Sequence, residues 1–236
     1  MNVRGRDAFE RDLARAIAEA GASAMREVIA GLGDPPNVDN VPAEVWQRYG
    51  EHLRALLREH LERVYRAQAE AMAGNLGKQP SESVDWTLAN QRAADWAETY
   101  SYELVRGVVD TTTGGINETL QRALREVIST GISDTLTRGQ ISDALEPYFG
   151  PRRAEMIAIT EVTRAAAQGE AGLVAQLGDV GIEITAVWHT SADDAVCEIC
   201  GEYDGQEQGD GWDELPPAHP GCRCFITHRI KGGTSD

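Results

Sequence analysis

Long apolar runs are absent from this chain of 236 residues. No stretch approaches the roughly twenty consecutive apolar residues that a helix needs to cross a bilayer, so we expect no association with a membrane. The first ten residues, MNVRGRDAFE, also lack the apolar centre of a signal peptide, so we expect no secretory leader. Both absences favour a protein that is made and kept in a reducing cytoplasm, where disulfides rarely persist.

Basic side chains are scarce relative to acidic ones. The chain has 22 Lys and Arg against 38 Asp and Glu, which gives a formal net charge of −16. Residues 179–236 contain twelve acidic and three basic side chains, so the excess of acid is greatest toward the C-terminus. Proteins that bind nucleic acid usually carry a basic stripe, and the sequence shows none, so we expect no strong direct binding to DNA.

Cysteine is rare as well, and its few copies are gathered in one place. All four cysteines, Cys197, Cys200, Cys222 and Cys224, fall in one stretch that also contains His219. The C-x-x-C spacing of the first pair lets two thiolates on a tight turn reach one cation, and a His/Cys half-site about twenty residues later completes a set of zinc ligands. Zinc accepts thiolate and imidazole together in a tetrahedron and adds no redox chemistry, so we expect a structural zinc ion.

Five candidate ligands compete for four positions around that zinc. His219 and Cys222 are three residues apart, which suits one turn of chain. Cys222 and Cys224 alternate, so on an extended strand their side chains point to opposite faces. We therefore favour Cys197, Cys200, His219 and Cys222 as the ligands, with Cys224 as the substitute. The alternatives are a disulfide pair or four reduced cysteines in a core, and the missing secretory signal disfavours the disulfide.

Apolar residues recur at the three-to-four spacing of one helix face through most of the chain. They predict helices over residues 7–32, 43–73, 81 to beyond 104, 116–130 and 152–177. Residues 133–150 read as a turn and a short helix, which Gly139 interrupts and Pro147 limits. Between the first two helices, Asp34-Pro35-Pro36 begins a linker or extended turn that reaches Pro42.

Three tryptophans, Trp46, Trp86 and Trp96, lie on the apolar stripes of the predicted helices. Large aromatic side chains at helical spacing usually pack in a core, so we expect all three to be largely buried between helices. The alternative is an exposed aromatic stripe that binds a partner protein.

After residue 181 the apolar pattern changes from helical spacing to alternation. Residues 182–188 read as a strand with one buried face, and residues 224–230 as its returning partner. The fold is therefore expected to be mainly α, with a long helical body followed by a small α+β Cys/His knob that resembles a zinc knuckle. The expected parts are a helical region over 1–110, a domain over 111–230 with its knob at 182–230, and a disordered tail over 231–236.

One ordered set of motifs carries a family likeness. It consists of I-T-E-V-T-R-A at 159–165, a strand ending at Trp188, Asp193-Asp194, the C-x-x-C pair, Asp204-Gly205, and P-P-A-H-P-G-C-R-C at 216–224. This order resembles the phage head morphogenesis family, which includes the Mu F-like minor head proteins and the gp7-like proteins of tailed phages. The likeness covers about residues 116–229, and the earlier part of the chain matches only in being helical.

The resemblance implies a minor capsid protein, a structural assembly factor that associates with the portal in the procapsid and has no enzymatic activity. It implies a role in head assembly or DNA delivery, with the portal and other head or scaffold proteins as partners. The implied location is the virion, at the capsid interior or portal vertex, after assembly in the host cytoplasm. We further hypothesise that helices 7–32 and 43–73, which lie outside the likeness, dock on the portal or scaffold.

The chain departs from the family pattern at position 159, where isoleucine stands in place of the usual arginine of A-R-T-E. This departure puts in doubt any essential role for a charge there. On the same helix, Glu161 and Arg164 are three residues apart. They form either a surface ion pair worth roughly a few tenths of a kcal/mol or a buried pair that fixes this helix against the knob.

Two other functions compete with the structural one. A zinc-dependent nucleic-acid-processing enzyme of the deaminase type needs H-x-E and P-C-x-x-C; His60-Leu61-Glu62 supplies the tripeptide, but no proline precedes Cys197. A histidine-rich zinc nuclease needs a second histidine cluster, whereas His189 and His228 stand alone. A zinc-stabilised DNA-binding module needs Lys and Arg around the zinc, and the predicted knob is acidic.

Overall fold

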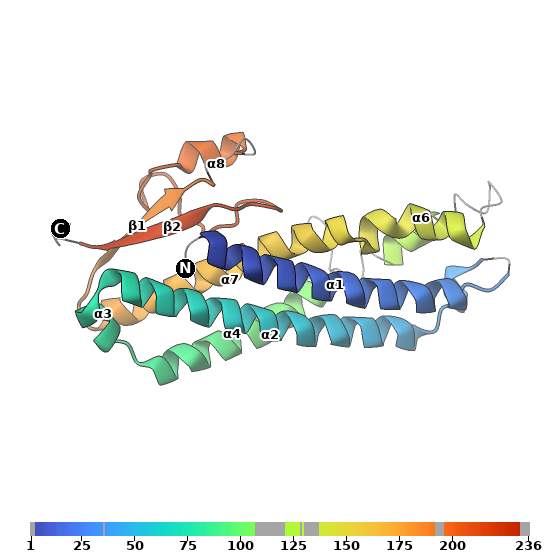
Figure 1. Ribbon diagram of the computed structural model, residues 1–236, viewed down its shortest axis with the longest axis horizontal. Coiled ribbons are helices and arrows are strands. Elements are labelled where there is room, and N and C mark those ends of the chain that lie inside the picture. Colours follow the sequence, from blue (N-terminus) through green and yellow to red (C-terminus); the bar gives the residue numbers. More distant parts are fainter. Residues whose placement is uncertain are drawn as a thin grey trace. The chain divides into compact units, whose positions relative to one another are not determined.

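The computed structural model describes residues 3–34, 36–106, 121–127, 129, 137–191 and 196–231, and most of them are helical (Figure 1). The elements are α1 (Val3–Gly31), η1 (Val38–Asn40), α2 (Ala43–Leu76), α3 (Lys78–Glu82), α4 (Trp86–Arg106), α6 (Arg138–Phe149), α7 (Pro151–Asp179), β1 (Ile184–His189), α8 (Glu198–Tyr203) and β2 (Phe225–Ile230). The predicted mainly helical chain with a small α+β element near its C-terminus is confirmed. Among the described residues, no helix combines the length and the apolarity needed to cross a membrane.

The long helices lie close to their predicted positions, because each has a continuous apolar stripe. Helix α1 begins four residues before its predicted start and ends one residue before its predicted end. Helix α2 ends three residues later than predicted, and α7 is longer than predicted by one residue at its start and two at its end. The predicted helix from residue 81 is instead two helices, α3 and α4. The reason is Asp85, whose carboxylate accepts hydrogen bonds from the backbone N–H groups of Thr87 and Leu88 at 3.0 and 3.1 Å. This is the bonding of a helix N-cap, so α4 begins only after Asp85.

The prediction that Gly139 interrupts and Pro147 limits the short helix is wrong, since α6 contains both residues. Its start is fixed by a capping box, in which Thr137 and Gln140 satisfy each other's backbone N–H groups. Gly139 falls in the first turn, directly after that cap. Pro147 falls in the last turn, where the missing N–H costs one hydrogen bond and the helix ends two residues later.

Several predicted features lie outside the described residues. Residues 121–127 are helical, in agreement with the predicted helix over 116–130, but both of its predicted ends fall outside. The same holds for the expected boundary near residue 110, for Asp193-Asp194 and for residues 232–236 of the expected tail.

The chain divides into two compact units, of which the second comprises Arg11–Glu59 and Ala97–Glu155. Its core is formed by the predicted apolar faces, with buried Leu13, Ile17, Ala20, Ala24, Val28, Leu53 and Leu57. Of the two predicted alternatives for this segment, the described residues 32–34 and 36–42 form the turn. The carbonyl of Leu32 accepts hydrogen bonds from the Asn37 N–H at 2.8 Å and the Asn40 side chain at 2.9 Å, which fixes the chain between the two helices.

The first unit comprises Met1–Glu10, His60–Trp96 and Met156–Asp236. Helices α2 and α7 approach so closely in it that a Cβ on Gly169 would lie 2.3 Å from the Tyr65 carbonyl oxygen, so only glycine fits there. Strands β1 and β2 pair antiparallel over their full length, with Trp188 opposite Ile226 (Figure 1). This pairing confirms the predicted strands and brings the two cysteine segments that flank them into one cluster.

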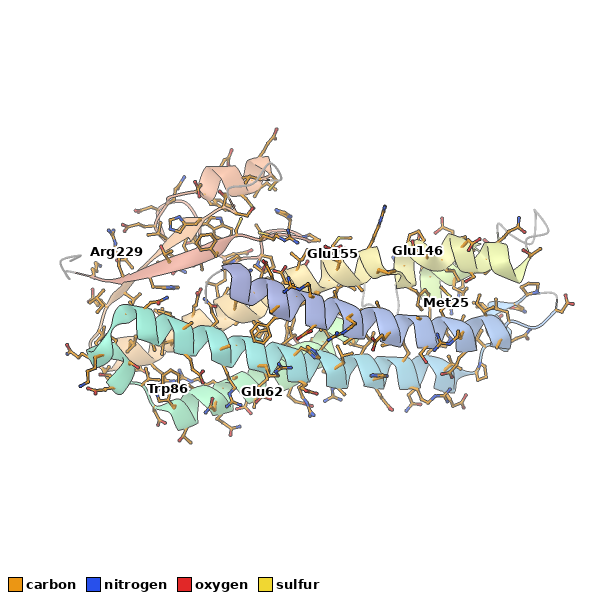
Figure 2. All side chains as sticks on the ribbon, in the orientation of Figure 1. Met25, Glu62, Trp86, Glu146, Glu155 and Arg229 are labelled. Atoms are coloured by element: carbon orange, nitrogen blue, oxygen red, sulfur yellow. The ribbon has the colours of Figure 1, made fainter. Side chains whose placement is uncertain are left out.

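Trp46, Trp86 and Trp96 were expected to be largely buried, and all three are partly buried without being fully enclosed. Figure 2 labels Trp86, which stands at the start of α4. The tryptophans that reach full burial are Trp188 and Trp212, with 1% and 4% of their surface exposed. Periodicity shows which side of a helix faces inward, but the rim of an apolar stripe is covered only as far as the neighbouring element extends.

Glu170 of α7 is a buried acid that makes the stability of the first unit depend on pH. Burial raises its pKa to about 7, against a hydrogen bond from the Gln68 amide and the charge of Arg6. Between its ordinary pKa and about 7 the folded chain keeps a proton that the unfolded chain releases, so stability is lost as pH rises through this window.

Glu170→Gln removes this ionisation. The free energy of unfolding of the variant minus that of wild type is therefore expected to be about 3 kcal/mol larger at pH 8 than at pH 5. Urea unfolding at both pH values measures the difference. The exposed Glu59→Gln on α2 is the control. Equal pH dependence of Glu170→Gln and wild type would contradict the expectation.

Candidate metal centre

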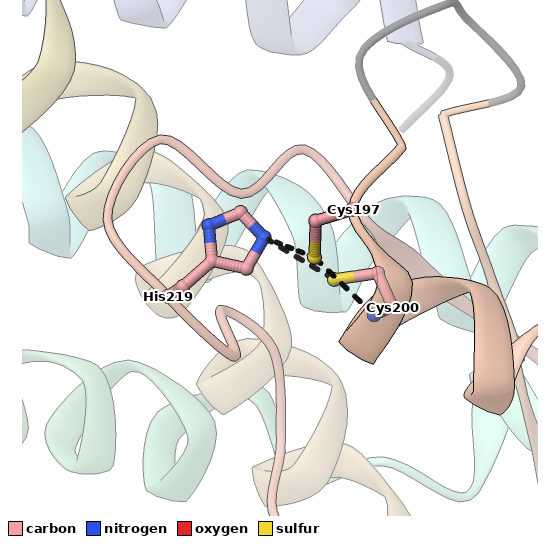
Figure 3. A group of neighbouring side chains, drawn as sticks. All are labelled: Cys197, Cys200 and His219. Carbon is pink, nitrogen blue, oxygen red and sulfur yellow. Dashed lines mark hydrogen bonds between the residues drawn. The ribbon is translucent and has the colours of Figure 1, made fainter.

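The first half of the site is the turn that carries Cys197 and Cys200. Cys197 is the N-cap of α8, and its sulfur accepts the backbone N–H of Cys200 at 3.4 Å. Because Cys197 caps the start of this short helix, the thiol of Cys200, three positions later, faces the same side as the thiol of Cys197. Figure 3 shows both sulfur atoms directed at the imidazole of His219.

The second half of the site is His219. Its Nε2 lies 3.2 Å from the sulfur of Cys197 and 3.3 Å from the sulfur of Cys200 (Figure 3). Its other nitrogen, Nδ1, is 2.9 Å from the carbonyl oxygen of Pro220. A backbone carbonyl accepts a proton from Nδ1, which leaves the lone pair of Nε2 directed at the thiols, the arrangement found for histidines that bind metals.

Cys222 reaches the site through the turn His219-Pro220-Gly221-Cys222. The N–H of Cys222 donates to the carbonyl of His219 at 3.1 Å, and Gly221 has a φ of +75°, which favours glycine. The sulfur of Cys222 lies 3.8 Å from that of Cys200. Two thiolates bound at about 2.3 Å to one tetrahedral zinc lie about 3.8 Å apart, so this pair fits zinc without movement.

The five candidate ligands form two groups that share Cys200. In one, the ligand atoms of Cys197, Cys200 and His219 lie within 4.8 Å of one another, and in the other those of Cys200, Cys222 and Cys224 do. Cys224 is 4% exposed and belongs to the core beneath the site, so it is both a buried thiol and a near neighbour of the ligands. The cluster can hold a metal ion.

The four thiols differ in acidity because their surroundings differ. The hydrogen bond with the Cys224 thiol lowers the pKa of Cys222 to about 5 despite burial, and the Cys200 N–H lowers the pKa of Cys197. Burial raises the pKa of Cys200 to about 12, and the bond to Cys222 raises that of Cys224 well above its usual range. Thiols that ionise readily bind metals best, so Cys197 and Cys222 are the favoured first ligands.

His219 also has a shifted pKa. Burial disfavours its charged form, but the Pro220 carbonyl and the thiols of Cys222 and Cys197 raise its pKa above the ordinary value. A metal bound at Nε2 takes the place of that proton.

Two threonines of α7 hold the second half of the site. The Thr160 hydroxyl donates to the Met156 carbonyl at 2.7 Å and accepts the N–H of Gly221 at 2.8 Å. The Thr163 hydroxyl donates to the carbonyl of Cys222 at 2.9 Å. These contacts give T-E-V-T its physical role, because threonines three residues apart on α7 face the same turn of chain. The motif is visible in the sequence, but the role of either threonine is not, because their partners lie about sixty positions away.

Glu161 and Arg164, between and beside these threonines, are paired at 3.3 Å. The Glu161 side chain is 6% exposed and that of Arg164 is 32% exposed, so the carboxylate is buried and the cation reaches solvent. The pair thus matches neither predicted alternative in full. Ile159 is buried and lines a pocket of about 260 Å³ beside the cluster.

An aromatic layer supports the cluster from below. Trp188 of β1 meets Tyr203 and Trp212 edge to face, with ring centroids 5.2 and 5.4 Å apart. Cys200, Cys222 and Cys224 pack on the same core. The rigid rings limit the movement of the loops that carry the ligands.

The other histidines that sequence analysis considered do not join the described cluster. His189 bonds Thr227 at 2.8 Å and stacks on Phe225. Burial lowers the pKa of His228 to about 4, so it stays neutral on β2. His60 lies on α2, and neither metal-binding group of the described residues contains it.

The family described as Phage Mu protein F like protein matches residues 112–227. The match includes the T-E-V-T helix, β1, the first half of β2 and all five cluster residues, and it coincides closely with the likeness expected over 116–229. No curated protein and no solved structure matches the chain.

Proposed function

Residues 112–227 belong to the Phage Mu protein F like family, a phage head morphogenesis family, and we propose that the chain is a minor head protein that joins the capsid next to the portal. The family implies capsid proteins as partners and the virion as the location. The observation that carries the proposal is that the matched segment contains the whole Cys/His cluster together with the helix that holds it. A small knob fixed in this way presents an ordered surface for assembly.

Within this function, the cluster is proposed to bind one structural zinc ion through Cys197, Cys200, His219 and Cys222. The Cys200–Cys222 separation and the orientation of His219 support zinc. Zinc would supply no chemistry beyond linking the two halves of the knob. Cys224 remains the substitute ligand, since its sulfur lies near those of Cys200 and Cys222.

A structural role is also proposed in preference to catalysis or DNA binding. Sites rich in thiolate ligands are usually closed and structural, whereas catalytic zinc keeps a position open for water. Glu198, Glu202, Asp204, Asp210, Asp213 and Glu214 are all exposed on the segment around α8. A surface with this charge repels phosphate, so a protein partner suits it better than nucleic acid.

The test is the composition of purified procapsids made with and without the portal. The chain is expected in portal-containing particles at a fixed small ratio to the major capsid protein, and at background level without the portal. Quantitative mass spectrometry of both preparations measures the ratio. Equal incorporation without the portal would refute the portal association, and absence from both preparations would refute the head-protein assignment.

A further inference from the structure

We propose that the start of α1, through Arg6, holds the Cys222-Arg223-Cys224 segment in its metal-binding position. This inference rests on the proposed metal site and adds a positioning residue that lies far outside the family match. Arg6 precedes Cys224 by 218 positions, so no local pattern in the sequence connects them.

The first support is a chain of hydrogen bonds from α1 to the cluster. One guanidinium nitrogen of Arg6 donates to the carbonyl of Cys224 at 3.3 Å, and the other donates to the hydroxyl of Thr163. That hydroxyl in turn donates to the carbonyl of Cys222 at 2.9 Å. The Arg6 side chain therefore fixes the backbone carbonyl of Cys224 directly and that of Cys222 through Thr163.

The second support is an ion pair one helical turn further along α1. Glu10 lies on the same face as Arg6, because residues four apart are neighbours on a helix. Its carboxylate is 3.9 Å from the guanidinium of Arg223, the residue between the two cysteines. Glu10 is buried and Arg223 is exposed, so solvent screens this contact in part and it adds less than the hydrogen bonds of Arg6.

The third support is charge. Arg6 is only 6% exposed, and its buried positive charge lies near the carboxylates of Glu10 and Glu170 and near the thiols of Cys222 and Cys224. A zinc site with three thiolates and one imidazole carries a net negative charge. The buried cation of Arg6 offsets part of that charge.

The consequence is a coupling between the N-terminal segment and the metal. If the contacts of Arg6 stabilise the metal-binding position, then metal binding must stabilise the docked start of α1 by the same factor. Loss of the metal therefore loosens the docked start of α1, and loss of the Arg6 contacts weakens metal binding.

The experiment compares full-length wild type with Arg6→Met in zinc affinity, measured by competition with a chromophoric chelator. Arg6→Met is expected to bind zinc 10- to 100-fold more weakly, the usual effect of losing a group that orients ligands. Arg6→Lys restores the charge without the paired hydrogen bonds and is expected to recover part of the affinity. Arg15→Met, which removes an exposed arginine of the same helix paired with Asp12, is the matched control and keeps wild-type affinity.

A second readout, the rate of thiol alkylation in metal-free protein, does not depend on zinc. In Arg6→Met, Cys222 and Cys224 are expected to react 10- to 100-fold faster than in wild type, the factor that loss of hydrogen bonds to a buried charge corresponds to. Cys197, which Arg6 does not contact in the described structure, serves as the internal reference. Glu10→Gln leaves Arg6 in place and is expected to give a smaller increase in the alkylation rates of Cys222 and Cys224. This variant takes the place of Arg6→Met if Arg6→Met fails to fold.

The outcomes separate the two proposals. A wild type that binds no zinc refutes the zinc site, and the alkylation rates then decide the role of Arg6. Unchanged alkylation of Cys222 and Cys224 in folded Arg6→Met, or in Glu10→Gln where Arg6→Met does not fold, overturns the positioning role. The positioning role is also overturned if wild type binds zinc and the zinc affinity of Arg6→Met is within twofold of the wild-type value.

Discussion

Replacing Cys200 with serine is expected to abolish tight zinc binding by the full-length protein. Cys200 is the cysteine common to both groups of ligand atoms, so its loss breaks both groups. Elemental analysis of protein purified without chelator should give about one zinc per wild-type chain and almost none for the variant. Because ligation energy is part of folding energy, Cys200→Ser is also expected to lower the melting temperature, as chelator does for wild type.

Cys224→Ala and Cys222→Ala decide the fourth ligand. With the proposed set, Cys224→Ala keeps its zinc and loses only the packing of a buried thiol, whereas Cys222→Ala loses zinc. The reverse result would give the fourth position to Cys224. A metal-free wild type that melts at the same temperature as zinc-loaded protein would show that no structural metal is present.

Trp188→Ala is expected to lower the free energy of unfolding by about 3–5 kcal/mol, as is usual for removing a large side chain from a core. Trp188 is 1% exposed and supports the cluster from below through Tyr203 and Trp212. The cavity left by its ring would also loosen the loops that carry the cysteines, so zinc affinity should fall in parallel. Urea unfolding by circular dichroism measures the stability of the variant.

The matched control for Trp188→Ala is Trp86→Ala, which truncates a half-buried ring in the same unit. Its cost is expected to be about 1–2 kcal/mol, because less apolar surface leaves water when this side chain packs. If the two variants lose the same free energy of unfolding, the aromatic layer beneath the cluster contributes no more to stability than a partly covered side chain at the rim of a helix.

The sequence by itself determined the features that depend on neighbouring residues. The long helices follow from apolar stripes, and their ends were predicted to within a few residues. The two halves of the Cys/His cluster were also predictable, because Cys197–Cys200 and His219–Cys222 each occupy one local turn with a fixed spacing. The order of these turns along the chain was sufficient to indicate the family, which the match over 112–227 confirms.

Only the tertiary structure decided which residues meet across long stretches of chain. Trp188 is enclosed by other aromatic rings, whereas Trp86 lies at a rim, although the sequence marks both as apolar positions. Arg6 reaches Thr163 across 157 positions and Cys224 across 218. A single hydrogen bond between distant segments leaves no periodic trace in the sequence, because only the folding of the chain brings its partners together.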